Sequence, residues 1–184
     1  MKNNMINILE KQHKVIVYDL ETEGLSYRKD RILTIDALKF KDGKLIDTFH
    51  MKGTPSGPIQ QIITDITGLT DNDFLEGTST EQEIAAAFSA FLDDDYVLMS
   101  YNGNFFDDKF IQKIGVNNTS DIDVYKLVKL FNPWATVTDN LKLEEFNRKV
   151  LKLEGDAHNS AFDALLTYRL YEMWIDAYEK YMKK

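Results

Sequence analysis

The sequence predicts an α/β fold, and the order of its apolar segments is the main reason. Strand-like segments come early, whereas the second half alternates short apolar strands with segments of helical periodicity. At 184 residues, the chain is long enough for one ordinary domain with its own core and too short for two. We therefore expect an N-terminal extension over residues 1–13, followed by a single domain over residues 14–184.

The first predicted strand, residues 14–21, is apolar on both faces, as in a central strand of a covered sheet. Residues 31–40 and 44–51 are the next strand candidates. Asp42 and Gly43 lie between them and provide the Asp-Gly signal of a tight hairpin. The first three strands should therefore be neighbours in the sheet.

Capping signals and periodicity predict the later elements. Thr80 and Glu83 form a capping box ahead of a helix, and helical turns are expected on both sides of Gly68. The final helix should begin at about Ser160, which we expect to be its N-cap. The remaining predicted elements are strands at residues 96–101 and near Ile122, and helices at residues 104–114, 124–131 and 141–150.

Composition excludes several classes of function. The absence of cysteine rules out disulfides, thiolate zinc sites and cysteine nucleophiles. A net charge of -8 argues against a protein that grips long nucleic acid through its phosphates. A site that holds only one strand end can instead gain affinity from metal cations and stacked bases. With no signal-peptide-like or membrane-length apolar run, we expect a cytoplasmic location and no membrane partner.

Candidate catalytic residues occur in three separated segments. In VIVYDLETEGL, Asp19 and Glu21 leave the same face of the first strand near its carboxyl end. Ligand sites of α/β sheets tend to lie at such strand ends. The same spacing of two acids recurs elsewhere in this acidic sequence, so the pair alone carries little weight.

The second segment, YNGNFFDDKFI, contains adjacent acids. Helical phase favours Asp107 as the functional one, because it shares a stripe with Phe110 and Ile111, while Asp108 should face solvent. The alternative role for Asp107 is as the N3 partner of a cap at Asn104.

The third segment, GDAHNSAFDALL, contributes His158 and Asp163. The two side chains converge best if His158 lies in the loop before the last helix and Asp163 lies in its first turn. A capping role is again the alternative for Asp163.

Convergence of the four carboxylates would require cations. Each pair of carboxylates at about 5 Å would repel by roughly 3 kcal/mol at an effective dielectric constant near 20. Divalent cations remove this conflict, and hard oxygen ligands favour Mg²⁺ or Mn²⁺ over zinc. The sequence therefore predicts a two-metal site suited to phosphodiester hydrolysis.

These segments resemble the three motifs of the DnaQ-like, or DEDDh, 3′-5′ exonucleases. DLETEGL is similar to their D-x-E-T-x-G-L motif, NGNFFD to their N-x-F-D motif, and HNSAFDA to their H-x-x-x-x-D-A motif. The resemblance runs from about Val15 to Trp174 and is closest to the proofreading domains of bacterial DNA polymerase III. It implies a ribonuclease H-like fold with a mixed five-stranded sheet flanked by helices.

The resemblance also implies roles for individual residues. The ligands of two divalent cations would be Asp19, Glu21, Asp107 and Asp163, and His158 would be the general base. Leu25 would be an apolar wedge beside the terminal base. The residues that hold the terminal nucleotide would be Leu20, Thr22, Leu25, Thr67, Asn102 and Phe106.

Two departures from the motifs leave the preferred substrate open. Tyr101 stands where many members have histidine, and Asn102 lies five rather than four residues ahead of Asp107. The first hypothesis is a metal-dependent 3′-5′ exonuclease that releases nucleoside 5′-monophosphates from single-stranded ends, with DNA as the expected substrate. The alternatives are an exoribonuclease acting on short RNA and a catalytically silent DnaQ-like binding module.

Partners other than the strand end are less defined by the sequence. A DNA polymerase, or a replication or repair complex, is a candidate partner because of the resemblance to proofreading domains. Four lysines could border the substrate path, although solvated helix faces are the favoured explanation for them. These are Lys109, Lys113, Lys126 and Lys129.

Overall fold

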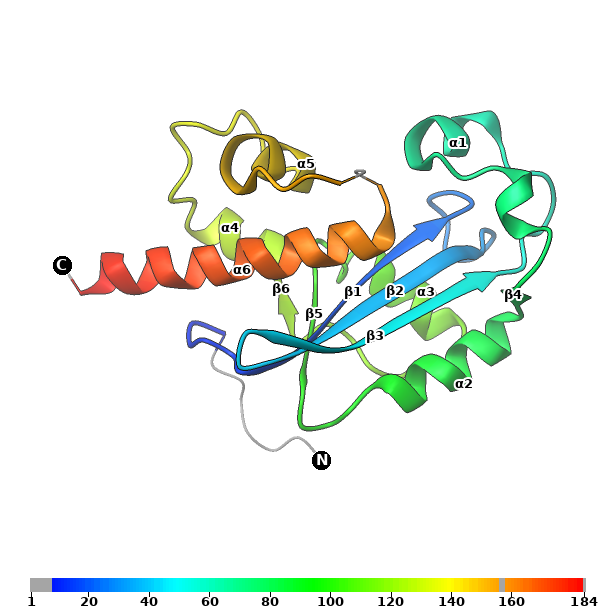
Figure 1. Cartoon of the computed structure of the whole chain (residues 1–184), viewed down its shortest axis with the longest axis horizontal. Helices are drawn as coiled ribbons and strands as arrows, with labels where there is room; N and C mark the ends of the chain where they lie inside the picture. The colour runs from blue at the N-terminus through cyan, green and yellow to red at the C-terminus, as the bar shows by residue number, and fades with distance from the viewer. Residues whose placement is uncertain (1–7, 156–157, 184) are drawn as a thin grey trace.

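One mixed sheet forms the centre of the molecule (Figure 1). The computed structural model describes residues 8–155 and 158–183, so residues 1–7 of the expected N-terminal extension lie outside the described residues. The strand order is β4-β3-β2-β1-β5-β6. In chain order the strands are β1 (Lys14–Thr22), β2 (Ile32–Lys41), β3 (Lys44–Gly53), β4 (Thr78–Ser79), β5 (Val97–Ser100) and β6 (Ile122–Asp123). The sheet thus has one strand more than expected, the two-residue β4.

Strand pairing follows the predicted hairpin. β2 pairs antiparallel with both β1 and β3, whereas β5 runs parallel to β1 and β6 parallel to β5. Asp42 and Gly43 both have positive φ, 49° and 78°, as the tight hairpin turn requires. The expectation that the first three strands are neighbours is confirmed.

Helices cover both faces of this sheet. The capping box is present, since the Glu83 amide donates to Thr80 Oγ1 at 3.3 Å and the Thr80 amide donates to Glu83 Oε2 at 2.7 Å. Gly68 ends the first helix with a φ of 75°. The α-helices are α1 (Gln61–Thr67), α2 (Glu81–Phe91), α3 (Asp107–Lys113), α4 (Val124–Leu130), α5 (Leu143–Phe146) and α6 (Ser160–Met182), with a 3₁₀ turn η1 (Asp71–Phe74) and a π-helical turn η2 (Asn147–Leu151).

The two faces of β1 belong to two different apolar clusters. Val15 and Val17 pack with residues of α6, including Trp174. Ile16 and Tyr18 point the other way and join a cluster with residues of α2 and α3. Because successive strand residues alternate between faces, the next residues on the α6 side are the two acids of the first motif. Figure 1 shows α6 crossing this side of the sheet, with its N-terminus near the carboxyl end of β1.

Two helix starts differ from the predictions. α3 begins at Asp107 rather than at Asn104, because residues 101–106 form a series of turns. The N-cap of α6 is Asn159, whose side chain accepts from the Phe162 amide at 3.1 Å. Ser160 is instead the first residue of the helix, so the prediction that it caps α6 was wrong.

The predicted helix at residues 141–150 is shorter and less regular than expected. It divides into the single turn α5 and the π-helical η2, whose C-cap, Lys152, has a φ of 53°. Within the described part of the chain, no helix is long and apolar enough to cross a membrane.

Candidate active site

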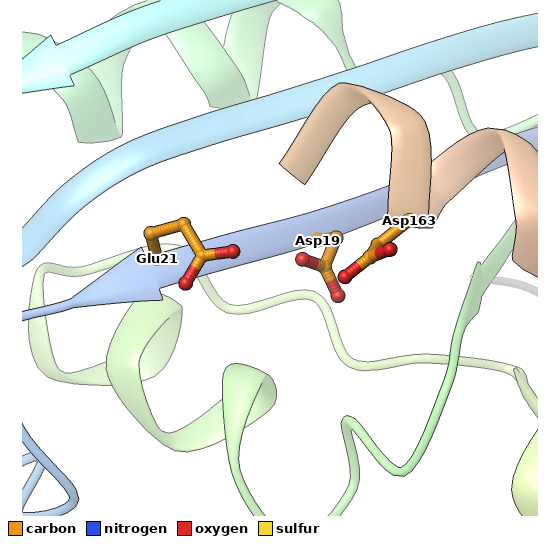
Figure 2. A group of neighbouring side chains, drawn as sticks. All are labelled: Asp19, Glu21 and Asp163. Atoms are coloured by element: carbon orange, nitrogen blue, oxygen red, sulfur yellow. The ribbon is translucent and has the colours of Figure 1, made fainter. Parts of the chain in front are cut away.

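Three carboxylates meet where the end of β1 passes under the first turn of α6. Asp19 and Glu21 project from β1, and Asp163 projects from α6 (Figure 2). Each offers one ligand atom, and these atoms all lie within 4.8 Å of one another. The strand alternation places the two β1 acids toward α6, and the buried stripe of that helix brings Asp163 down onto them.

A cleft of about 490 Å³ opens at this cluster. Asp107, the first residue of α3, and His158, in the turn before α6, line it together with the three clustered acids. The structure thus brings all five predicted catalytic residues to one cleft. Asp107 is outside the group whose ligand atoms lie within 4.8 Å of one another.

Asp107 and Asp108 are both buried and differ in the groups that their carboxylates contact. Asp108 is 3% exposed, so the expectation that it faces solvent was wrong. Its carboxylate accepts from Tyr18 Oη at 2.6 Å, from Asn104 Nδ2 at 2.6 Å and from the Ser120 amide and hydroxyl at 3.0 and 2.9 Å. Asp107 lines the cleft instead. The capping alternative for Asp107 is also wrong, because Asn104 binds Asp108 and α3 begins at Asp107.

A tight turn ahead of α3 holds Asp107 at the cleft. A Cβ on Gly103 would lie 2.2 Å from Ser100 Oγ and 3.3 Å from Asp107 Oδ2, so only glycine fits there. The preceding residue, Asn102, has a φ of 60°, and its amide donates to Asp123 Oδ1 at 2.8 Å.

His158 is fixed through its backbone. It has a φ of 60°, and its amide donates to Asp163 Oδ2 at 3.2 Å. The residue is exposed and lies in the turn before α6, as the sequence predicted. Its imidazole is therefore open to the cleft while its main chain is tied to one of the acids.

The electrostatics of the cleft disfavour several negative charges at once. Burial, together with the charges of Asp163 and Asp107, raises the pKa of Glu21 to about 8. Burial likewise raises the pKa of Asp107 to about 7 and that of Asp163 to about 6. The pKa of Asp19 is well above its ordinary value because of burial and of Asp107 and Asp163 nearby. A site with these properties gains stability from any cation that enters it.

Among the described residues, no lysine or arginine forms an ion pair with these acids. Within residues 8–155 and 158–183, the ion pairs of lysine and arginine go to other acids, and none reaches the four carboxylates of the cleft. The donor set consists of carboxylate oxygens, which fits hard divalent cations such as Mg²⁺ and Mn²⁺.

The residues expected to hold a terminal nucleotide divide into two groups. Leu20, Asn102 and Phe106 line the cleft. Thr22 and Thr67 do not, and each hydroxyl is used locally: Thr22 Oγ1 donates to Gly24 O at 2.8 Å, and Thr67 Oγ1 to Ile63 O at 2.9 Å.

Leu25 lies apart from the cleft, in a neighbouring hollow. Its side chain is 88% exposed, and the hollow that it lines shares Phe106 with the cleft.

Sequence reasoning missed the second wall of the cleft. Tyr101 Oη donates to Leu141 O at 2.5 Å and its ring packs edge-on against Tyr125, with centroids 5.9 Å apart. Apart from Tyr101, which adjoins the second motif, no motif marks this wall, because it depends on how residues 131–146 fold back over the sheet. The lining residues that were not predicted are Tyr101, Tyr125, Leu141, Lys142, Leu143 and Glu144.

A further missed residue, Asp36, did have a signal. It lies opposite Asp19 in the β1–β2 register and is a single acid within the apolar strand ILTIDALKF. Its carboxylate accepts from Ser160 Oγ at 2.5 Å and is 2.9 Å from His50 Nδ1. Asp36 thereby ties the first turn of α6 to β2.

Comparisons with known proteins agree with this geometry. The family model described as Exonuclease, RNase T, matches residues 16–171. The PolC-type DNA polymerase III of Halalkalibacterium halodurans is 31% identical over 174 residues, and that of Bacillus subtilis is 29% identical over 191 residues. These alignments cover 90% and 96% of this chain but only 12% of each polymerase.

Solved structures show the same fold. E. coli exonuclease I in complex with a dT13 oligonucleotide has a TM-score of 0.79 at 17% identity, over 94% of this chain and 43% of that one. The zinc-bound form of its complex with single-stranded DNA has a TM-score of 0.76 at 18% identity, over 93% and 43%. The expected ribonuclease H-like fold is confirmed. Since the family match spans most of its length, the chain belongs to the exonuclease family.

Proposed function

We propose that this protein is a metal-dependent 3′-5′ exonuclease that hydrolyses single-stranded DNA to nucleoside 5′-monophosphates. The observation that carries the proposal is the meeting of Asp19, Glu21 and Asp163 within 4.8 Å, in a cleft that Asp107 and His158 also line. Membership of the exonuclease family supports hydrolysis of a phosphodiester.

The four acids would hold the divalent cations on which the reaction depends. When bound, these cations supply Lewis-acid activation of the attacking water and neutralise charge on the leaving oxygen. The protein prepares for them by burying carboxylates beside one another, so that the free site is disfavoured at neutral pH.

His158 would act as the general base. Its imidazole lines the cleft, and its main-chain amide is held by Asp163, so the base and one acid move together. The imidazole would take a proton from water as the water oxygen forms a bond to phosphorus and the bond to the leaving 3′ oxygen breaks. The products are a nucleoside 5′-monophosphate and a strand shortened by one nucleotide with a new 3′ hydroxyl.

The size and lining of the cleft support action on a strand end. Its volume of about 490 Å³ suits one nucleotide, and Leu20 and Phe106 offer apolar surface to a base. The net charge of -8 does not favour binding along a duplex. The complexes of exonuclease I with single-stranded DNA support that substrate, and the PolC-type relatives support proofreading beside a polymerase.

The test is degradation of a 5′-labelled single-stranded oligonucleotide with Mg²⁺ or Mn²⁺. We expect a ladder shortened from the 3′ end, release of monophosphates, and no reaction on a strand with a blocked 3′ end. Asp19→Ala and His158→Ala should each abolish or strongly reduce cleavage. Internal cuts, or full activity in both variants, would contradict the proposal.

Two further arms separate the remaining alternatives. A matched RNA oligonucleotide, cleaved faster than the DNA, would make the protein an exoribonuclease. A chain that cleaves neither strand and gains no thermal stability from Mg²⁺ or Mn²⁺ would be a silent binding module, because a cation bound only to the folded state raises its stability.

A further inference from the structure

A second hollow adjoins the candidate active site. It has a volume of about 310 Å³ and shares one lining residue, Phe106, with the cleft. The connection between β1 and β2 forms one side of the hollow, and the turn and helix around Asp107 form the other. The residues that line it are Leu25, Ser26, Tyr27, Arg28, Phe105, Phe106, Lys109 and Phe110.

Two consecutive phenylalanines at this hollow have opposite environments. Phe106 is half-buried and packs on Phe110, with ring centroids 5.0 Å apart, whereas Phe105 is 62% exposed. Leu25, across the hollow, is 88% exposed. Large apolar side chains that gather at a concave surface mark a binding site more often than isolated ones do.

Cations surround these exposed side chains, although the protein as a whole is acidic. Arg28 and Lys109 line the hollow, and Lys126 Nζ lies 5.4 Å from the centroid of the Phe105 ring. In the part of the chain that the structure describes, none of the three forms an ion pair with a carboxylate. Lys113, one turn beyond Lys109, differs in pairing with Glu81 at 2.8 Å.

We propose that this surface, the Phe105 patch of Leu25, Arg28, Phe105, Lys109 and Lys126, binds the single-stranded DNA that continues from the nucleotide held in the cleft. A base upstream of the scissile bond stacks on Phe105, and the three cations contact phosphates. Aromatic faces accept any base, and cations whose contacts are to neutral groups, such as Lys126 to Asn104 Oδ1 and Arg28 to Tyr27 Oη, keep their charge for the backbone. The inference rests on the proposed function, because it requires the strand end to occupy the cleft.

Comparing two substrates distinguishes the contribution of the Phe105 patch from that of the cleft. The p-nitrophenyl ester of thymidine 5′-monophosphate has a terminal nucleotide and no upstream strand, whereas an eight-nucleotide DNA has both. In Phe105→Ala we expect KM for the oligonucleotide to rise about tenfold, equivalent to ~1.4 kcal/mol, and kcat to change little. Hydrolysis of the ester should stay within about twofold of wild type, which also shows that the variant is folded.

Binding measured without turnover tests the cations separately. With Ca²⁺ in place of Mg²⁺, Lys109→Ala should make the slope of log affinity against log salt concentration shallower by about 0.7, as expected for one lost phosphate contact on a single strand. Phe105→Ala should weaken binding and leave that slope unchanged. Leu45→Ala, a matched truncation of a side chain that is 51% exposed at the far hairpin, should change neither quantity.

The outcomes distinguish this inference from the proposed function. A wild-type chain that hydrolyses neither substrate overturns both. A wild-type chain that hydrolyses both, with the same oligonucleotide KM in Phe105→Ala and Leu45→Ala, overturns only the patch and leaves it as a surface for a protein partner. An equal loss on ester and oligonucleotide would also overturn it, because Phe105 would then act on the cleft.

Discussion

The buried acids of this protein fall into two regions that meet at one peptide bond. On one side, Asp108 has donors on both carboxylate oxygens, from Tyr18, Asn104 and Ser120. On the other side, Asp107 lines a cleft that it shares with Asp19, Glu21 and Asp163. Both residues are at least nine-tenths buried.

The difference lies in what compensates the burial. A carboxylate that accepts several hydrogen bonds is stabilised by the protein itself and can hold structure together. Carboxylates that face one another raise each other's pKa and leave compensation to a ligand from outside. Burial alone therefore does not distinguish the two regions, whereas a position in a cleft shared with other carboxylates does.

The largest effect should come from removing one charge of the cleft. Asp19→Asn is expected to lower kcat by at least ~1,000-fold, since residues that act as a catalytic unit lose most of their effect together. The same change should not lower the free energy of unfolding measured in EDTA, because it removes repulsion. Steady-state kinetics and urea unfolding provide the two numbers. A large loss of unfolding free energy in EDTA would instead give Asp19 a structural role like that of Asp108.

The converse change is Asp108→Ala. We expect a loss of ~3 kcal/mol of unfolding free energy, because three donor residues lose their common acceptor in a buried site. Tyr18→Phe, which removes one of these donors, should cost only ~1 kcal/mol. Urea unfolding measures both. If Asp108→Ala left stability unchanged and abolished activity, the two regions would have been assigned the wrong way round.

The turn at Gly103 sets the position of Asp107, so a substitution there tests whether the cleft depends on that turn. Gly103→Ala should cost ~1–3 kcal/mol, because its Cβ would lie 2.2 Å from the buried Ser100 Oγ, and it should also lower kcat by moving Asp107. Gly57→Ala is the matched control, since a Cβ there would meet no atom within 4 Å. Thermal unfolding and oligonucleotide cleavage compare the two variants, and equal effects would show that the turn tolerates a side chain.

The smallest effect is a pH dependence confined to the cleft. The pKa values of Asp163, Asp107 and Glu21 are raised to about 6, 7 and 8. Such groups bind more protons folded than unfolded, so stability in EDTA should fall as pH rises from about 4 to 8. Saturating Mg²⁺ should flatten the curve. A metal-free melting temperature that rises over this range would contradict the raised pKa values.

Much of the fold was predictable from local patterns. The Asp42-Gly43 turn set the antiparallel pairing of β2 and β3, and the Thr80–Glu83 box marked the start of α2. β4 was missed because two residues carry no periodicity. The helix expected at residues 141–150 became α5 and η2, because apolar periodicity does not show where the backbone widens into a π turn.

The site was predictable only where a single element decides the direction of a side chain. Strand alternation placed Asp19 and Glu21 on one face, and the buried stripe of α6 placed Asp163 above them. Helical phase failed for Asp108, because the segment that carries Ser120 covers the side of α3 expected to be open. The Tyr101 and Leu141 wall depends on contacts between residues 40 apart, which one sequence does not reveal.

The acid cluster joins β1 to α6, which begins at Ser160. Asp19 and Glu21 are therefore synthesised well before Asp163. Contacts of such long sequence separation form late in folding, after the intervening elements have closed the loop. A growing or partly folded chain therefore lacks the Asp163 side of the site. If the proposed activity is present, it would appear only with the docking of α6, so that catalysis would report this late folding step.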